Sequence, residues 1–329
     1  LDWAFNKAGK KATGITNKIP MLMKIQRKEI NRVKRATKLI VERLEKIIHS
    51  VPNIQELPIF YRKLSNILVN NDDLRKNLGR INGVIPVLNK LKGDYIRLIT
   101  KQDNSGACGR KRMQFFGRVS SVIRDLDPAF KFLNECREKL KQIPPINLQM
   151  PNVVVAGYPN VGKSTLVGKI STAKPHVSSY PFTTKQIYIG TYIDQYGSKY
   201  FQVIDTPGIL DRPMKDRNFI EQQAILALNT IATIVLFVFD PTLTSGYDVE
   251  SQVELYKEIK GEFLEGLSIP LKIIVNKTDM ATSEEMEELL KKIGKKSSQI
   301  VQVSAKEGVN TDLVLDYLLD YFKGTNFRR

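Results

Sequence analysis

Hydrophobic positions follow two different patterns along the chain, and the change between them lies near residue 145. From about residue 24 to residue 141, apolar residues recur every three or four positions, which predicts amphipathic helices. From residue 152 onward, short continuous apolar runs alternate with helical patterns. Such runs are typical of buried parallel strands, and their alternation with helices predicts an α/β layer.

The first half is predicted to be an antiparallel helical bundle with short connections. One face of its first helix carries Ile30, Val33, Ile40, Leu44 and Ile47. A shorter helix covers residues 60–68, and a long one runs from Leu74 to Leu98, where Pro86 should introduce a kink. Two more helices follow, at residues 113–126 and after Asp127-Pro128, because aspartate and proline favour a helix start.

We expect a division into two domains, an all-α helical bundle at residues 1–145 and an α/β domain at residues 146–329. The stiff segment Ile143-Pro144-Pro145 would link them. The second domain should hold a mostly parallel sheet, with an antiparallel edge strand from the hairpin that joins residues 187–193 to residues 199–204. Binding loops in such a sheet lie at the carboxyl ends of the strands.

A glycine-rich loop follows the apolar run at residues 153–156. It has the pattern G-x-x-x-x-G-K-S and consists of Gly157, Tyr158, Pro159, Asn160, Val161, Gly162, Lys163 and Ser164, with Thr165 next. Strand, glycine loop and helix in this order predict a phosphate-binding loop, or P-loop, whose backbone N–H groups cradle a triphosphate. Lys163 should reach the β- and γ-phosphates, and Ser164 should bind Mg²⁺. The alternative is a glycine turn before a helix with nothing bound.

A second motif consists of Asp205, Thr206, Pro207, Gly208 and Ile209, and it follows the strand at residues 200–204. Asp205 should hold a Mg²⁺-bound water, as in other hydrolases with this loop. Gly208 should turn its N–H towards the γ-phosphate. The alternative for Asp205 is a solvated aspartate at a strand end.

The polar segment Ser179–Lys185, which contains Phe182, Thr183 and Thr184, lies between these motifs. One threonine hydroxyl should complete the Mg²⁺ shell, with Thr184 favoured over Thr183. The segment then orders with the γ-phosphate and relaxes after hydrolysis. Lys163, Thr184 and Gly208 are the expected catalytic residues. The alternative is a β-prone surface loop.

Asn276, Lys277, Thr278 and Asp279 follow the strand at residues 273–275 and predict guanine recognition. The Asp279 carboxylate can accept hydrogen bonds from guanine N1–H and N2–H₂, which adenine lacks, so ATP would leave it unpaired. Lys277 should lay its stem over the base. Ser304, Ala305 and Lys306 come after the strand at residues 299–303 and should cap the base through backbone N–H groups.

Many GTPases carry a glutamine just after the second motif, where it orients the attacking water. This chain has Ile209 and Leu210 there, and neither side chain forms hydrogen bonds. We therefore expect slow intrinsic hydrolysis or charge supplied from elsewhere. The following cations are either close to the γ-phosphate or solvated: Arg212, Lys215 and Arg217.

The net charge of +17 belongs to the first half of the chain. Residues 1–150 hold 31 Lys and Arg against 13 Asp and Glu, which is +18, and residues 151–329 hold 20 against 21, which is −1. This asymmetry indicates a polyanionic partner for the bundle, and RNA is favoured over a merely solvated helix face. The expected RNA contacts are Arg27, Lys28, Arg32, Lys34, Arg35, Lys38, Arg110, Lys111, Arg112 and Arg118.

Phe115 and Phe116 lie within the second basic cluster and would either stack on bases or pack in the core, and their helical spacing favours the core. The longest apolar run, residues 231–239, is far shorter than the ~20 residues that span a bilayer, so no membrane partner is expected. The two cysteines, Cys108 and Cys136, cannot form a disulfide framework and indicate a reducing compartment.

The strings at residues 157–164, 180–185 and 205–211 resemble those of the Obg-type GTPases. Residues 216–225, D-R-N-F-I-E-Q-Q-A-I, resemble the nucleolar GTP-binding protein 1 family, as do Ile59-Phe60-Tyr61 and the basic helical region. The resemblance covers nearly the whole chain. Asn160 is similar to an asparagine that coordinates K⁺ in several GTPases with a hydrophobic residue after the second motif, and the alternative is that it only shapes the loop.

The resemblance implies a Mg²⁺-dependent GTPase that binds GTP and GDP and acts in assembly of the large ribosomal subunit, with ribosomal RNA and precursor particles as partners. The end of the chain at Arg329 predicts a short archaeal-like form, which would be cytoplasmic and monomeric. Two alternatives stay open. One is a GTP-gated ribosome-binding placeholder with incidental hydrolysis, and the other is an Obg-type regulator of translation or stress.

Overall fold

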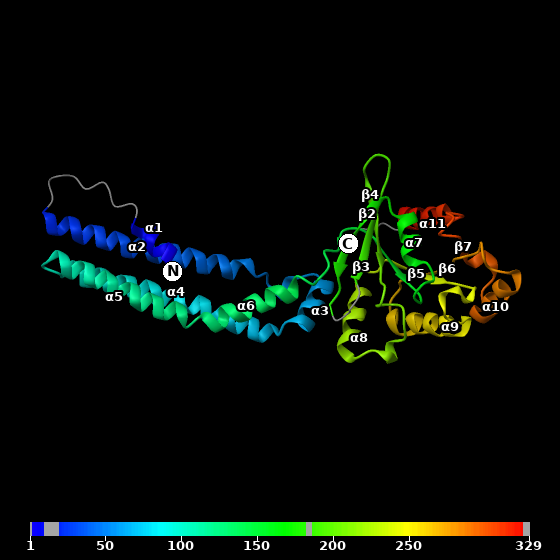
Figure 1. Cartoon of the computed structure of the whole chain (residues 1–329), viewed down its shortest axis with the longest axis horizontal. Helices are drawn as coiled ribbons and strands as arrows, with labels where there is room; N and C mark the ends of the chain where they lie inside the picture. The colour runs from blue at the N-terminus through cyan, green and yellow to red at the C-terminus, as the bar shows by residue number, and fades with distance from the viewer. Residues whose placement is uncertain (1, 10–19, 182–185, 325–329) are drawn as a thin grey trace. The chain divides into compact units, whose positions relative to one another are not determined.

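The structure is a computed structural model that describes residues 2–9, 20–181 and 186–324 (Figure 1). The chain forms two compact units. A helical unit consists of residues 1–56 and 69–139, and an α/β unit consists of residues 57–68 and 140–329. Within the described ranges, no helix combines the length and the apolar character needed to cross a membrane.

The helical unit confirms the predicted long helices. Its elements are α1 (Asp2–Gly9), α2 (Met21–Ser50), η1 (Ile54–Glu56), α4 (Asn71–Thr100), α5 (Ser105–Arg124) and α6 (Asp127–Leu140). The helix α4 continues through Pro86. The start of α5 lies before the predicted residue 113, because the Asn104 side chain accepts the Ala107 N–H and caps a first turn that has no apolar pattern. The helix α1 was not predicted.

The core of the helical unit is made by the predicted apolar faces. Val33 of α2, Ile81 of α4 and Phe115 of α5 are fully buried, and they belong to one contiguous cluster. Asn70 caps α4 by accepting the N–H groups of Asp72 and Asp73. Negative charge in a first helical turn also interacts favourably with the helix dipole.

The α/β unit is built on a seven-stranded sheet in the order β2-β3-β4-β1-β5-β6-β7. The strands are β1 (Asn152–Ala156), β2 (Ala173–Ser179), β3 (Gln186–Ile193), β4 (Lys199–Asp205), β5 (Ile234–Phe239), β6 (Leu271–Val275) and β7 (Val301–Gln302). The parallel pairs from β4 to β7 confirm the predicted mostly parallel sheet. The antiparallel part has two strands, β2 and β3, where one edge strand was expected. The missed strand β2 contains His176, Ser178 and Ser179, so no apolar alternation marks it.

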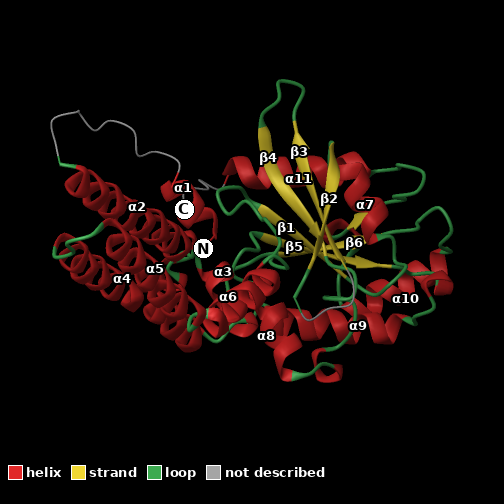
Figure 2. Ribbon diagram, turned by 60° about the vertical axis from the view of Figure 1, so that its left-hand side comes forward, coloured by secondary structure: helices red, strands yellow, loops and turns green. Residues whose placement is uncertain are grey.

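Helices cover both faces of this sheet (Figures 1 and 2). The helices α7 (Lys163–Ile170) and α11 (Thr311–Gly324) lie on one face, and α8 (Phe219–Leu228), α9 (Val249–Glu258) and α10 (Ser283–Ile293) lie on the other. A π-helical turn, η4 (Ile259–Phe263), extends α9. Short 3₁₀ turns are η2 (Met214–Asp216), η3 (Leu243–Ser245) and η5 (Ser297–Gln299). The loops after β1, β4, β5 and β6 therefore emerge along one edge of the sheet.

The helix α3 (Ile59–Leu68) belongs to the α/β unit, although the expected boundary at residue 145 placed it in the bundle. Phe60 and Leu64 are buried in the core of the α/β unit, and α3 packs against α8. The Tyr61 hydroxyl donates a hydrogen bond to the Ile146 carbonyl at 2.7 Å. The amphipathic pattern of α3 predicts a buried face but does not reveal which partner covers it.

We expect Phe60→Ala to destabilise the α/β unit by about 3–5 kcal/mol, because it opens a cavity beside α8. Hydrogen–deuterium exchange of the β1, β4 and β5 amides measures this change in the full chain. The neighbouring Ile59, which is 54% exposed, provides the control Ile59→Ala with little effect. Loss of protection in α2, α4 and α5 alone would instead assign α3 to the helical unit.

Candidate functional site

The loop between β1 and α7 has the backbone that a phosphate-binding loop requires. Gly157 and Gly162 have φ angles of 135° and 97°, which favour glycine. A Cβ at Gly157 would lie 2.5 Å from the Val238 carbonyl oxygen, and one at Gly162 would lie 2.1 Å from Asn276 Nδ2. Both positions therefore exclude any side chain, for steric as well as conformational reasons.

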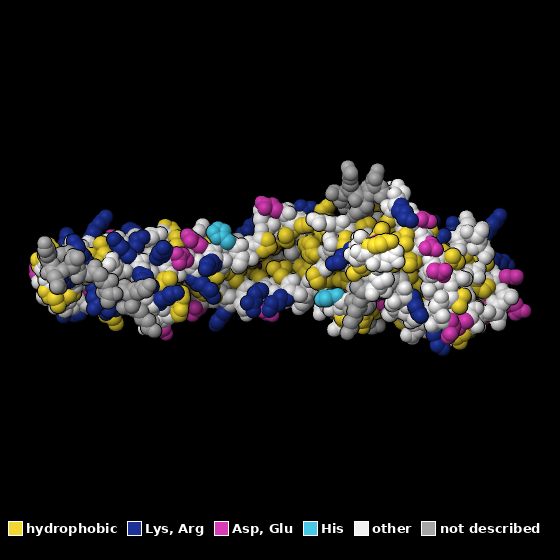
Figure 3. Space-filling view, turned by 90° about the horizontal axis from the view of Figure 1, so that it is seen from above, with side chains coloured by type: hydrophobic (Ala, Val, Ile, Leu, Met, Phe, Trp, Pro, Cys, Tyr) yellow, Lys and Arg dark blue, Asp and Glu magenta, His cyan; other side chains and the backbone are white. Residues whose placement is uncertain are grey.

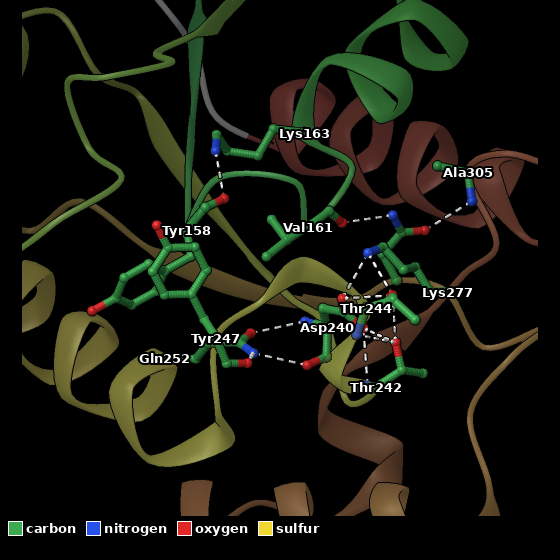
Figure 4. Close-up of polar contacts among 11 residues, drawn as sticks. Tyr158, Val161, Lys163, Asp240, Thr242, Thr244, Tyr247, Gln252, Lys277 and Ala305 are labelled. Carbon is green, nitrogen blue, oxygen red and sulfur yellow. Dashed lines mark hydrogen bonds and ion pairs between the residues drawn. The ribbon is translucent and has the colours of Figure 1, made fainter.

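The side-chain amide of Asn276 joins three of the predicted binding segments. Its Nδ2 donates to the Val161 carbonyl at 2.8 Å, and its Oδ1 accepts the Ala305 N–H at 2.8 Å. Val161 and Ala305 lie at opposite ends of these two bonds in Figure 4. Asn276 is only 3% exposed, so the bonds are sheltered from water. The structure thus brings the glycine loop, residues 276–279 and residues 304–306 together.

A cavity of about 300 Å³ opens where these segments meet. The predicted residues that line it are Asn160, Gly162, Thr165, Asn276, Lys277, Asp279, Ser304 and Lys306. Thr244 and Met280 also line it and were not predicted. The cavity is of the size and polarity expected for a nucleoside, with Asp279 available to a base and the glycine loop on one side.

Asp240 is a buried site residue that the sequence reading missed. It follows β5, and its carboxylate accepts hydrogen bonds from the Lys277 ammonium at 2.7 Å and the Thr242 hydroxyl at 2.7 Å. The Lys277 ammonium also donates to the Thr244 hydroxyl at 2.9 Å (Figure 4). Its position in the sequence could have identified it as a site residue, because Asp240 comes at the end of a buried strand as Asp205 does. Lys277 has a φ of 62°, and this network holds its strained backbone and its stem at the cavity.

The backbone around Asp240 is also clamped. Gln252 of α9 accepts the Asp240 N–H and donates to the Asp240 carbonyl, both at 2.9 Å (Figure 4). Tyr247 in the same loop contacts Tyr158 of the glycine loop, with 4.2 Å between ring centroids. Burial raises the pKa of Tyr158, so this ring is neutral at physiological pH. These contacts give the loop after β5 one defined position beside the cavity.

At the Lys163 end of the site, polar side chains bond to the backbone and to one another. Lys163 is buried, and its ammonium donates to the carbonyls of Gly157 at 2.8 Å and Tyr158 at 2.7 Å. The Ser164 hydroxyl donates to Asp205 Oδ2. Burial raises the pKa of Asp205, while the Ser164 hydrogen bond and the Lys163 charge oppose that shift.

Asp205 and Ser164 fit a Mg²⁺ ion. Asp205 Oδ1 is buried and has no hydrogen-bond partner among the described residues. A carboxylate oxygen in that situation is costly unless a cation or an ordered water satisfies it. Since the hydroxyl of Ser164 lies beside it, the pair offers the hard oxygen ligands that Mg²⁺ prefers.

The second motif folds back on itself. The Thr206 hydroxyl donates to the Val155 carbonyl at 2.7 Å, and the Gly208 N–H donates to Asp211 Oδ2 at 2.6 Å. Pro207 is half-buried beside them, and Ile209 is fully buried in the core. The remaining predicted switch residues, Phe182, Thr183 and Thr184, lie outside the described residues.

The predicted RNA-binding residues differ in exposure. Arg32 and Arg112 are half-buried and form ion pairs with the buried Glu29 at 2.8 and 2.5 Å. Arg35 and Lys111 are half-buried. The exposed group is Arg27, Lys28, Lys34, Lys38, Arg110 and Arg118. Figure 3 shows Lys and Arg side chains spread over the helical unit on the face drawn.

The two phenylalanines of the second basic cluster pack in the core, as their spacing favoured. Phe115 is fully buried with its ring edge-to-face against Tyr95. Phe116 stacks on Phe5 of α1, with 4.0 Å between ring centroids. The Arg112 guanidinium lies over the Phe116 ring, 5.1 Å from its centroid. Base stacking by this pair is therefore not available in this conformation.

We expect Asp240→Asn to weaken GDP binding about tenfold, because a charge-assisted hydrogen bond of about 1.5–3 kcal/mol no longer holds Lys277 at the cavity. Titration with a fluorescent GDP analogue measures the dissociation constant. In a Lys277→Met background, the same substitution should have no further effect on that constant. Additive losses in the double variant would show that Asp240 does not act through Lys277.

Comparison with known proteins divides the chain near residue 150 and, unlike the structure, places α3 with the N-terminal helices. A family model described as the NOG1 N-terminal helical domain matches residues 1–147. A second model, described as a 50S ribosome-binding GTPase, matches residues 152–277. Together they cover most of the helical unit and the strands that carry the cavity.

Relatives match across both units. An uncharacterized protein of Methanocaldococcus jannaschii is 40% identical over 82% of this chain and 73% of its own length. Nucleolar GTP-binding protein 1 of Encephalitozoon cuniculi is 32% identical over all of this chain but 61% of its own length. That of Arabidopsis thaliana is 35% identical over 75% of this chain, which spans 36% of the relative.

Among solved structures, a nucleolar GTP-binding protein 1 from Plasmodium falciparum is 29% identical, with a TM-score of 0.45 over 55% of this chain and 90% of that one. The chain therefore belongs to the nucleolar GTP-binding protein 1 family.

Proposed function

We propose that this GTP-binding protein hydrolyses GTP and uses the nucleotide state to control its docking on precursors of the large ribosomal subunit. The observation that supports this most directly is the 300 Å³ cavity, in which the glycine loop, Asp279 and Ser304 converge. The relatives named nucleolar GTP-binding protein 1 and the match to a 50S ribosome-binding GTPase support the ribosomal partner.

In this proposal, each end of the site recognises one part of GTP. Asp279 accepts hydrogen bonds from the guanine edge, and Lys277 supports the base with its stem. Lys163 exchanges its two backbone carbonyl partners for phosphate oxygens. Ser164 and Asp205 hold Mg²⁺, which would neutralise charge on the phosphates.

Hydrolysis in this chain lacks a side chain that orients water after the second motif. Ile209 is fully buried, and its hydrocarbon side chain forms no hydrogen bond to water. The intrinsic rate should therefore be slow, and K⁺ near Asn160 or the ribosomal particle would supply the missing charge. Asn160 lines the cavity with a φ of 62°, which also agrees with a purely shaping role.

The exposed cations of the helical unit are the proposed RNA contacts. Arg27, Lys28, Lys34 and Lys38 lie on α2, and Arg110 and Arg118 lie on α5. Side chains of this kind contact phosphates without reading sequence. The proposed partner is ribosomal RNA within a large-subunit precursor, because the excess positive charge of the chain lies in residues 1–150.

A second candidate function is a GTP-gated placeholder on the ribosome whose hydrolysis is incidental. The buried Ile209 favours it, since Ile209 and Leu210 offer no hydrogen-bonding side chain to the attacking water. The two functions differ in whether precursor particles accelerate hydrolysis.

We expect large-subunit precursor particles to accelerate GTP turnover in the presence of Mg²⁺. Asp205→Asn should weaken Mg²⁺ binding about 10–100-fold and remove most of the turnover. Asp316→Asn, at an exposed position on α11, is the matched control and should leave turnover unchanged. If particles do not accelerate turnover, the placeholder function is favoured. Equal turnover rates in K⁺ and Na⁺ buffers of the same ionic strength would exclude the proposed K⁺ site.

For RNA binding, we expect the combined change of Arg27, Lys28, Lys34 and Lys38 to Ala to reduce the salt dependence of affinity. Each lost phosphate contact lowers the slope of log K against log salt by about 1. The control alters the same number of exposed lysines of the α/β unit to Ala: Lys199, Lys291, Lys295 and Lys323. Filter binding to ribosomal RNA at several salt concentrations measures both. Equal slopes for the two variants would contradict a docking surface on α2.

A further inference from the structure

The backbone N–H and C=O of Gly208 are both held by one buried ion pair. Its N–H donates to Asp211 Oδ2 at 2.6 Å, and its carbonyl accepts a hydrogen bond from Arg217 Nη1 at 3.1 Å. Arg217 Nη2 lies 3.5 Å from Asp211 Oδ1 and completes the ring of contacts. Gly208 itself has a φ of 76°, a conformation that suits glycine.

The pair is part of the folded interior, although sequence reasoning treated Arg217 as either a γ-phosphate contact or a solvated residue. The Arg217 and Asp211 side chains are 1% and 5% exposed. Arg217 is followed by the start of α8, where Asn218 and Glu221 form a capping box. The Gln222 side chain of the first turn donates to the Arg217 carbonyl at 3.2 Å. The position of Arg217 is therefore fixed by helix geometry as well as by charge.

We propose that Asp211 determines the preference between GTP and GDP, because its carboxylate competes with the γ-phosphate for the Gly208 N–H. This inference rests on the proposed function, in which Gly208 senses the third phosphate. One N–H at 2.6 Å from a carboxylate oxygen cannot also serve a second anion. GDP has no third phosphate, so its binding leaves the contact between Asp211 and Gly208 undisturbed.

Two further consequences of the contact disfavour GTP. A γ-phosphate that approaches Gly208 meets the negative charge of Asp211, and like charges at that distance repel. Arg217 cannot relieve this alone, because it is already shared between Asp211 and the Gly208 carbonyl. Binding of GTP therefore requires the Gly208 peptide to leave the ion pair, and the cost of that release lowers the apparent affinity for GTP.

The test compares Asp211→Asn with the wild-type chain. Asparagine keeps the size of the side chain but removes the charge that strengthens its hydrogen bond to Gly208. With Mg²⁺ present, we expect the dissociation constant for a non-hydrolysable GTP analogue to fall about tenfold. The constant for GDP should change less than twofold. Titration with the two fluorescent nucleotides measures the ratio of these constants, in which general effects on the pocket cancel.

Asp216→Asn is the matched control, because Asp216 is an exposed aspartate in the same segment and should not alter the ratio. If the single variant is unstable, the double variant Asp211→Asn/Arg217→Gln takes its place, because it keeps the buried pair neutral. It should show the same shift in preference towards the GTP analogue. A ratio that stays at the wild-type value, or that moves towards GDP, would overturn the role of Asp211. A wild-type chain that binds neither nucleotide would instead refute the proposed function.

Discussion

The nucleotide pocket depends on the buried amide of Asn276, which bonds at once to Val161 and Ala305. The amide joins its own loop to two others, and without it the Val161 carbonyl and the Ala305 N–H would lose these hydrogen bonds. The same amide explains Gly162, since a Cβ there would overlap it. The pocket is thus organised around hydrogen bonds between groups of the chain itself.

The chemistry of the pocket is predictable from sequence because it requires fixed residue types at fixed spacing after buried strands. Gly157, Lys163 and Asp205 could be located for that reason, and parallel register brings their strands together. Asp240 obeys the same positional rule, but an aspartate after a strand is common, and only its ion pair with Lys277 distinguishes it.

Other features depend on tertiary contacts that a linear pattern does not contain. Arg32 and Arg112 appear in basic runs, yet both pair with Glu29, because a buried carboxylate needs a partner of opposite charge. The amphipathic face of α3 shows that it is covered, whereas the partner, α8, lies more than 150 residues away along the chain. In such cases the residue pattern limits the possibilities, and packing selects among them.

Contacts of the second motif and of Tyr180 converge at the helix α8. Arg217 precedes it and holds the Gly208 peptide, and the buried Tyr180 hydroxyl, just before residues 182–185, donates to the Ala224 carbonyl at 2.6 Å. Because α3 is close-packed against α8, a displacement of α8 must be accommodated by α3. Residues 56 and 69, at the two ends of that segment, belong to the helical unit. Both ends of α3 are therefore joined covalently to the helical unit, while its packed face belongs to the core of the α/β unit.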